Sequence, residues 1–237
     1  LVAGISAARN GADVLILEQK EKVGKKILAT GNGRCNFTNA YMTADCFRSE
    51  QKENVSAVLE RFGTRETLCF FEELGILPKD RKGYYYPKSN QASAILDVLI
   101  MELKRLNVEI VCNSRVTEIV KNKQFKIVSS TGTYVADAVI LSAGGKAAAS
   151  LGSDGSGYSL AKVFGHTISP VVPALVQLHG NGTFFKQIAG VRADAKISLY
   201  VDNRLLGEDT GEIQFTDYGI SGIPVFQISR FASLALY

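Results

Sequence analysis

The stretch LVAGISAARNGADVLILE, residues 1–18, decides the fold of this chain. Small and apolar residues recur at helical spacing over residues 1–8, which predicts a helix packed closely on a neighbour and ended by Gly11. The DVLILE segment, residues 13–18, is apolar on both faces at its centre, which is typical of a parallel strand buried between helices. A helix that leads into such a strand predicts an α/β fold built on a parallel sheet.

Glu18 stands at the carboxyl end of this predicted strand. In dinucleotide-binding βαβ units an acidic residue at this place accepts hydrogen bonds from a ribose, about 20 residues after the first glycine of the phosphate-binding turn. That spacing places the glycine turn before Leu1, and the chain starts without methionine inside a helical pattern, so we expect it to be part of a longer protein. The alternative is that Glu18 is a solvated acid at a strand end.

The segment GKKILATGNGRCNFTN, residues 24–39, has the composition of a ligand-binding loop. Glycines let backbone N–H groups approach a ligand closely, lysine and arginine neutralise phosphate, and asparagine and threonine offer uncharged hydrogen bonds. The candidate binding residues in this loop are Lys25, Lys26, Gly31, Gly33, Arg34 and Asn36. A surface turn built on the Asn-Gly pair is the alternative, and Cys35 is expected to be a small packed residue.

Two later glycine-rich segments are candidates for the same ligand. Residues 138–145, AVILSAGG, predict a buried strand that ends at the carboxyl edge of the sheet, although an ordinary strand-to-loop turn has the same pattern. Residues 152–166, GSDGSGYSLAKVFGH, predict a glycine loop that leads into a helix from about Tyr158. A helix N-terminus after glycines favours anions.

The middle of the chain predicts helices interrupted by a hairpin. Residues 52–106 have mainly helical periodicity, and Ser89 is the predicted N-cap of the last helix in this range. The segment KDRKGYYYPKS, residues 79–89, predicts a hairpin or an extended loop. Residues 108–112 predict another buried strand, and residues 115–135 predict short antiparallel strands.

After Pro170 the pattern changes to short strands separated by Gly, Asn and Asp turns, which predicts a β-rich domain. We therefore expect a first domain over 1–169 and the beginning of a second over 170–237.

Composition and charge exclude several classes of protein. The 237 residues carry 27 basic and 23 acidic side chains, a net charge of +4 that is too mild to indicate a nucleic-acid partner. No apolar run approaches the roughly 18 residues of a membrane span, and no signal-peptide pattern is present. Four scattered cysteines predict neither a disulfide framework nor a metal site and indicate a cytoplasmic location. The oligomeric state stays open.

At these motifs the chain resembles one family. The segments GKKILATGNGRCNFTN, VILSAGG, GSDGSGYSLAKVFGH, PALVQL and GEIQFTDYGISGIPVFQISR occur in an order similar to that of the BaiN-type NAD(P)/FAD-dependent oxidoreductases. This family includes aminoacetone oxidases and a bile-acid reductase. The resemblance covers the whole chain and implies a two-dinucleotide-binding, Rossmann-like FAD domain with a parallel sheet and a small antiparallel meander. It also implies a β-rich domain that is inserted into the FAD domain.

The resemblance also implies roles for individual residues. Glu18 would bind the ribose of the FAD adenosine, Gln19 would lie beside it, and Val116 would meet the adenine through its backbone. The residues implied to bind the cofactor are Glu18, Gln19, Lys25, Lys26, Gly31, Gly33, Arg34, Asn36, Val116, Ala143, Gly144 and Gly145.

The chain departs from the family pattern at three positions. Asp154 and Ser156 stand where many relatives carry Thr and Asp. Asp217 stands where some relatives carry His, so a catalytic histidine is not expected there.

The function predicted from residues and resemblance together is that of an FAD-dependent oxidoreductase. It would pass a hydride through flavin N5 to or from a small organic substrate, with NAD(P)H as the electron donor. No protein residue is assigned a catalytic role. The alternatives are a flavin-dependent RNA-modifying enzyme, which would need a basic face, and a non-catalytic flavin-binding module.

Overall fold

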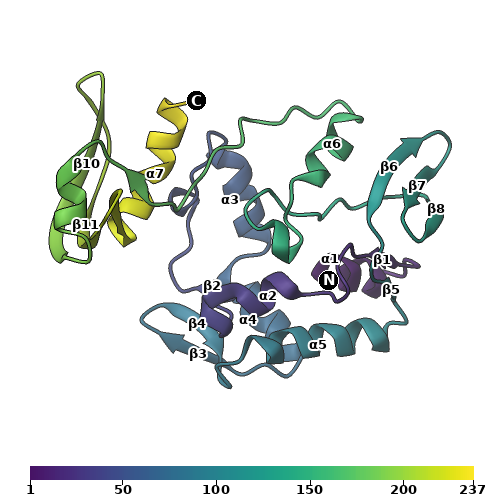
Figure 1. The fold of residues 1–237 in the computed structure, drawn as a ribbon. Helices are drawn as coiled ribbons and strands as arrows, with labels where there is room; N and C mark the ends of the chain where they lie inside the picture. Colours follow the sequence, from purple (N-terminus) through teal and green to yellow (C-terminus); the bar gives the residue numbers. More distant parts are fainter. The chain divides into compact units, whose positions relative to one another are not determined.

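The computed structural model describes residues 1–237, which divide into two compact units, Leu1–His166 and Thr167–Tyr237 (Figure 1). The sequence predicted a domain boundary between residues 169 and 170. That the two units are an FAD-binding domain and an inserted domain stays a prediction. No helix in either unit is long and apolar enough to cross a membrane.

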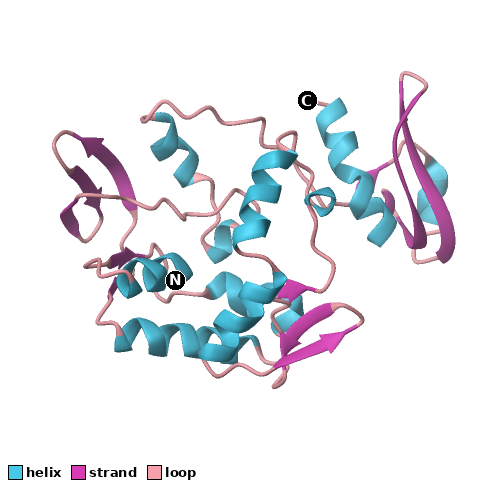
Figure 2. Ribbon diagram, turned by 180° about the vertical axis from the view of Figure 1, so that it is seen from behind, coloured by secondary structure: helices cyan, strands magenta, loops and turns pink.

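The first unit combines helices with short strands (Figure 2). Its helices are α1 (Val2–Arg9), α2 (Lys25–Ala29), α3 (Lys52–Arg61), α4 (Thr64–Glu73), α5 (Ala92–Arg105) and α6 (Ser156–Lys162). Its strands are β1 (Leu15–Leu17), β2 (Thr38–Asn39), β3 (Pro78–Arg81), β4 (Tyr84–Pro87), β5 (Glu109–Val111), β6 (Val116–Lys121), β7 (Phe125–Ser129) and β8 (Gly132–Ala136).

The predicted parallel sheet is present as the pair β1 and β5, with Ile16 opposite Ile110. Helix α1 packs closely on this sheet, because a Cβ at Gly4 would lie only 2.9 Å from Ile16 Cδ1 and 3.5 Å from Leu103 Cδ2. The small residue at position 4 thus lets the helix approach both the strand and α5.

Helix α5 supplies most of the core of the first unit. Its apolar residues Ile95, Leu99 and Leu103 recur four residues apart and are buried on one face. They form a single cluster with Ile5 of α1 and Phe71 of α4. Burial of each such side chain stabilises the fold by about 1.5–3 kcal/mol, so this cluster holds the helices against the sheet.

The two predicted antiparallel elements are also present. Strands β3 and β4 form the hairpin over the tyrosine segment, and β2 adds to it in the order β2-β4-β3. Strands β6, β7 and β8 form a three-stranded meander. The first unit therefore combines a parallel pair with antiparallel sheets, as the fold class requires.

Two local predictions were wrong. Residues 138–145 form no strand, and Ile140 and Leu141 are 65% and 43% exposed. A strand forms only where a neighbour completes its hydrogen bonds, and the parallel sheet of this chain contains β1 and β5 alone. Ser89 is not an N-cap: α5 begins at Ala92 after Gln91, and the Ser89 hydroxyl instead accepts a hydrogen bond from the Gln91 N–H in the preceding turn.

The second unit is a four-stranded antiparallel sheet with one helix. Its elements are β9 (Leu178–His179), β10 (Arg192–Val201), β11 (Arg204–Thr216), β12 (Gly219–Gly222) and α7 (Ile223–Ala235), with the strands in the order β10-β11-β12-β9. Helix α7 packs on this sheet through the buried side chains of Val225 and Ile228. A Cβ at Gly207 of β11 would lie 2.9 Å from Phe231 Cδ2, so a glycine there permits the close approach.

Candidate functional site

Glu18 directly follows β1 at the carboxyl end of the parallel pair. Its backbone N–H donates to Val111 O at 2.9 Å, and its carbonyl accepts from Ser114 N at 2.8 Å, so the backbone is tied to the chain around β5. The half-buried carboxylate accepts the Lys20 backbone N–H on Oε1 at 2.9 Å, while Oε2 accepts no hydrogen bond. One carboxylate oxygen at the sheet edge is therefore available to a ligand.

Gln19, the next residue, belongs to a polar network that joins three distant segments. Its Nε2 donates to Gly152 O at 2.5 Å, and its Oε1 accepts from Arg115 Nη1 at 2.8 Å. The same Arg115 nitrogen donates to Asp154 Oδ2 at 2.8 Å. The network holds the glycine loop 152–156 beside the end of β1.

Asp154 also orders the start of α6. Its Oδ1 accepts the Ser156 N–H at 3.0 Å. Hydrogen bonds from Ser156 and then from Arg115 hold the pKa of the Asp154 carboxyl well below its usual range, although partial burial opposes them. The carboxylate of Asp154, a residue that departs from the family pattern, thus has hydrogen-bond donors within the protein for both of its oxygens. Arg115 was missed from the sequence; its only signal was its place directly before Val116.

The Ala143, Gly144 and Gly145 triplet packs against the same loop. Gly145 O accepts the Gly155 N–H at 2.9 Å. A Cβ at Gly144 would lie 2.8 Å from Ser153 Oγ, and a Cβ at Gly145 would lie 2.9 Å from the Tyr158 hydroxyl. The left-handed backbone at Gly144 (φ 75°) favours glycine there, and both contacts leave little room for a side chain; the binding role of the triplet stays a prediction.

The loop 24–39 is rich in left-handed backbone. The φ angle is positive at Gly31 (56°), Asn32 (54°), Gly33 (78°) and Cys35 (58°). A Cβ at Gly31 would lie 2.8 Å from the backbone nitrogen of Asn36, whereas nothing lies within 4 Å of one at Gly33. The loop's own fold requires glycine at 31, while the space around position 33 is open for a ligand to approach.

Asn36 and Arg34 fasten this loop to the β3–β4 hairpin. Asn36 Nδ2 donates to both Thr38 O and Tyr85 O at 2.9 Å. Arg34 Nε donates to Gly31 O at 3.2 Å, and its guanidinium lies over the ring of Tyr86, 5.3 Å from the ring centroid. Both side chains hold the loop in shape, and the outer nitrogens of the Arg34 guanidinium remain unpartnered.

The remaining predicted residues differ in their surroundings. Lys25 forms an ion pair with Glu21 at 2.8 Å, whereas Lys26 is exposed and has no partner. Val116 begins β6, and its side chain packs beside the buried cluster of Ile119 and Ile127. The structure thus gathers Glu18, Gln19, Val116 and the 143–145 segment around one network, and gathers Gly31, Arg34 and Asn36 at the hairpin.

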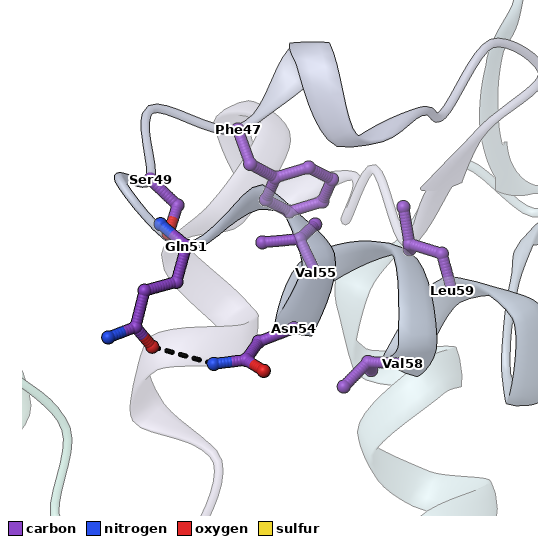
Figure 3. A pocket seen from close by; sticks show the side chains of 7 residues that line it. All are labelled: Phe47, Ser49, Gln51, Asn54, Val55, Val58 and Leu59. Atoms are coloured by element: carbon purple, nitrogen blue, oxygen red, sulfur yellow. Dashed lines mark hydrogen bonds between the residues drawn. The ribbon is translucent and has the colours of Figure 1, made fainter.

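A shallow hollow in the first unit lies apart from the predicted residues. Its volume is about 300 Å³, and it lies beside α3 and the segment before it (Figure 3). The side chains that line it are Phe47, Ser49, Gln51, Asn54, Val55, Val58 and Leu59. None of these residues carries the chemistry of a cofactor site.

The chain's own residues fit a dinucleotide at the edge of the parallel pair. Glu18 offers an unpartnered carboxylate oxygen, which suits the hydroxyls of a ribose. At the end of the loop 24–39, the buried Thr38 Oγ1 and Asn39 Oδ1 have no hydrogen-bond partner. Buried polar atoms are rarely left unsatisfied, so these two suit a ligand with polar ring edges.

Known proteins are similar to this chain in sequence over nearly its whole length. The chain is 55% identical over 240 residues to the 3-dehydro-bile acid delta(4,6)-reductase of Clostridium scindens, a match that covers 100% of this chain and 59% of that protein. It is 27% identical over 229 residues to the ribosomal RNA dihydrouridine synthase of Escherichia coli, with 95% and 56% covered. The chain therefore spans less than two thirds of the length of the curated relatives it matches.

Two solved structures of other proteins are more distantly similar to this chain. NikD, an unusual amino acid oxidase essential for nikkomycin biosynthesis, matches with 16% identity and a TM-score of 0.36, over 61% of this chain and 48% of that one. Thermovibrio ammonificans THI4 matches with 13% identity and a TM-score of 0.38, over 79% and 66%. At these scores neither likeness carries an argument about function.

The family model described as the HI0933-like protein Rossmann domain matches residues 1–229. With the bile-acid reductase likeness, it confirms the resemblance seen in the motifs and the Rossmann-like, mixed α/β fold class. The chain belongs to the HI0933-like Rossmann-domain family.

Proposed function

We propose that the intact protein is an FAD-dependent oxidoreductase. The observation that carries the proposal is Glu18, whose unpartnered carboxylate oxygen stands at the carboxyl end of a parallel strand in a chain of the Rossmann-domain family. An acid at that place binds a ribose in dinucleotide sites. The 55% identity to a reductase supports the same assignment.

The residues that would hold the cofactor divide into three groups. Glu18, with Gln19 beside it, would bind the adenosine ribose, and Val116 would meet the adenine. Gly31, Gly33, Arg34 and Asn36, with Lys25 and Lys26, would line the cofactor along the loop 24–39. Ala143, Gly144 and Gly145 would close over it. When bound, FAD would supply hydride transfer at its N5 atom, with NAD(P)H as the source of electrons.

The names of two relatives support a common substrate class. A delta(4,6)-reductase and a dihydrouridine synthase both add hydrogen to a carbon–carbon double bond. In each case that bond is conjugated to a carbonyl group, which makes its far carbon an acceptor for hydride. We propose that the intact protein reduces such an activated double bond in a small organic substrate of alicyclic character.

The test is a visible spectrum of the intact protein, followed by acid release of the bound flavin. We expect FAD, and we expect anaerobic bleaching by NADH or NADPH with recovery of colour on addition of a 3-oxo-4,6-diene steroid acid. Recovery of FMN alone, or of no flavin, would contradict the cofactor assignment. Bound FAD that no reductant bleaches would instead indicate a non-catalytic flavin-binding module.

A second candidate is reduction of uridine in ribosomal RNA. The likeness to two ribosomal RNA dihydrouridine synthases, at 27% and 25% identity, favours it. The β3–β4 hairpin also carries basic residues beside three tyrosines, a pairing suited to stacking on single-stranded RNA. Incubation of the reduced protein with unmodified ribosomal RNA, followed by analysis of its nucleosides, separates the two candidates: dihydrouridine would favour RNA over the small substrate.

A further inference from the structure

Two arginines from distant parts of the sequence converge on one tyrosine ring. Arg34, in the loop 24–39, places Cζ 5.3 Å from the centroid of Tyr86, and Arg81, at the end of β3, places Cζ 5.8 Å from the same centroid. A cation over an aromatic ring is attracted only weakly where the site is partly exposed, so each contact favours this arrangement only modestly.

The hairpin and the loop fix this cluster from both sides. Lys79 pairs with Tyr86 and Arg81 with Tyr84 across β3 and β4, so Arg81 and Tyr86 are diagonal neighbours on one face of the hairpin. Arg81 Nη2 donates to Asn90 Oδ1 at 2.7 Å, which orients the guanidinium. A Cβ at Gly31 would lie 3.3 Å from Tyr86 Cε1, so the glycine lets the loop reach the ring.

Neither guanidinium has an anionic partner. Other arginines of the same unit form ion pairs: Arg9 and Arg105 with Glu102, and Arg115 with Asp154. Arg34 and Arg81 are half-buried, yet neither forms an ion pair. Two like charges that face one ring repel each other, and partial burial weakens the solvent screening that would reduce this repulsion.

The adjacent carboxylate is engaged elsewhere. Asp80 precedes Arg81 in β3, but its Oδ1 accepts the Gly83 N–H at 2.7 Å and closes the hairpin turn. The guanidinium nitrogens not used by Gly31 O and Asn90 Oδ1 are therefore left for a group that is outside the chain. Arginine presents its donors in a planar fork that matches a carboxylate or phosphate.

We propose that Arg34 and Arg81, arranged about Tyr86, form a binding site for an oxyanion of a small ligand, a carboxylate or a phosphate group. The oxyanion has two sources within the proposed function: a phosphate of the dinucleotide or a carboxylate of the substrate. The site itself does not depend on turnover, because binding of the anion requires neither hydride transfer nor a reductant.

The experiment measures binding to the intact protein by isothermal titration calorimetry. One arm titrates FAD into apoprotein, and the other titrates cholate and its uncharged methyl ester into the protein as purified. The variants are Arg81→Met, Arg81→Lys and Arg34→Lys. The control is Arg65→Met, since Arg65 is an exposed arginine of the same unit that forms no ion pair.

We expect Arg81→Met to lower the binding affinity measured in one of the two titrations by about tenfold to a hundredfold, as for loss of a charge-assisted hydrogen bond. The affinities of Arg65→Met should stay within about twofold of those of the wild type. Weaker FAD binding with an unchanged ratio of the affinities for cholate and its methyl ester identifies a phosphate of the dinucleotide as the bound oxyanion. Weaker cholate binding with unchanged ester binding identifies the substrate carboxylate. In either case the lysine variants, which keep the charge but lose the fork, should fall between wild type and Arg81→Met.

The proposal is overturned if FAD, cholate and ester all bind Arg81→Met within about twofold of wild type, or if acid and ester weaken equally while FAD does not. Circular dichroism checks folding, and Arg81→Lys decides the question if Arg81→Met does not fold. Failure of the proposed function would instead be seen as absence of flavin binding by the wild-type protein or absence of bleaching, and the cholate and ester titrations depend on neither.

Discussion

At the scale of single residues, Glu18 carries the dinucleotide assignment. We expect Glu18→Ala to weaken FAD binding by the intact protein about tenfold to a hundredfold, because charge-assisted hydrogen bonds contribute about 1.5–3 kcal/mol. Glu18→Asp should lose less, since it keeps the carboxylate one methylene shorter. The measurement is quenching of flavin fluorescence on titration into apoprotein.

Glu18→Gln is the matched control for the local fold, because its amide oxygen still accepts the Lys20 N–H that Oε1 accepts in the wild type. It should keep the fold and bind FAD less tightly than Glu18→Asp. Wild-type affinity in Glu18→Ala would remove the ribose role of this residue.

Glu102 is the one charged side chain among the buried residues. It is 7% exposed and accepts hydrogen bonds from Arg105 at 2.7 Å and Arg9 at 2.8 Å, which lower its pKa from 4.5 to about 2 against the effect of burial. Arg105 is itself largely exposed, so solvent screens part of this interaction. Glu102→Gln should lower the free energy of unfolding by about 1–2 kcal/mol at pH 7.

The difference in free energy of unfolding between the wild type and Glu102→Gln should depend on pH in a definite direction. A carboxyl whose pKa is depressed on folding stabilises the protein above its unfolded pKa, and the stabilisation is lost as the pH falls through the folded pKa. The difference in free energy of unfolding between the wild type and Glu102→Gln should therefore become smaller as the pH falls from 4.5 to about 2. Urea unfolding at pH 7, 4.5 and 3 measures it, and a gap that widens on acidification would show that the ion pair is not its cause.

At the scale of elements, the loop 24–39 depends on two glycines for different reasons. The Cβ added by Gly33→Ala has nothing within 4 Å of it. This variant should therefore lose only about 1 kcal/mol of the free energy of unfolding, because alanine disfavours the left-handed backbone conformation at this position. Gly31→Ala adds a Cβ 2.8 Å from the Asn36 nitrogen and should cost about 2–3 kcal/mol as the loop is forced to shift. Urea unfolding of the two variants compares them directly; equal losses would show that the contact with Asn36 does not restrain the loop.

The Arg115–Asp154 pair joins the start of β6 to the loop before α6. Arg115→Gln should raise the rate of amide hydrogen exchange over residues 152–158, because Asp154 loses its ion pair and Gln19, which binds Gly152 O, loses the hydrogen bond from Arg115 that orients it. Arg192→Gln, which breaks the exposed pair between Arg192 of β10 and Glu212 of β11, is the control and should leave this segment unchanged. Unaltered exchange at 152–158 in Arg115→Gln would mean that the backbone contacts alone hold the loop.

At the scale of the whole molecule, the two units are joined by a segment without helix or strand, residues 167–177. Val171 and Leu175 in this segment are 47% and 66% exposed, so a protease that cleaves beside small apolar residues has access to them. We expect limited digestion of the intact protein with elastase to cut within 167–177 before it cuts α5. Mass spectrometry of the fragments identifies the site, and early cleavage inside α5 with 167–177 intact would contradict the division into units.

The sequence by itself determined the elements whose signal is local. The apolar repeat of α5, the doubly apolar β1, the tyrosine hairpin and the meander were all predicted, because a helix face or a strand is encoded in residues close together along the chain. The family, too, was recognisable from short motifs read in order.

Only the tertiary structure decided which of these pieces meet. The contacts of Arg115 with Gln19 and Asp154, and of Arg34 and Arg81 with one ring, join residues far apart in sequence that no local pattern pairs. The same reason explains the error at 138–145: its apolar pattern is local, but a strand also needs a hydrogen-bonding neighbour, and in this chain the sheet supplies none.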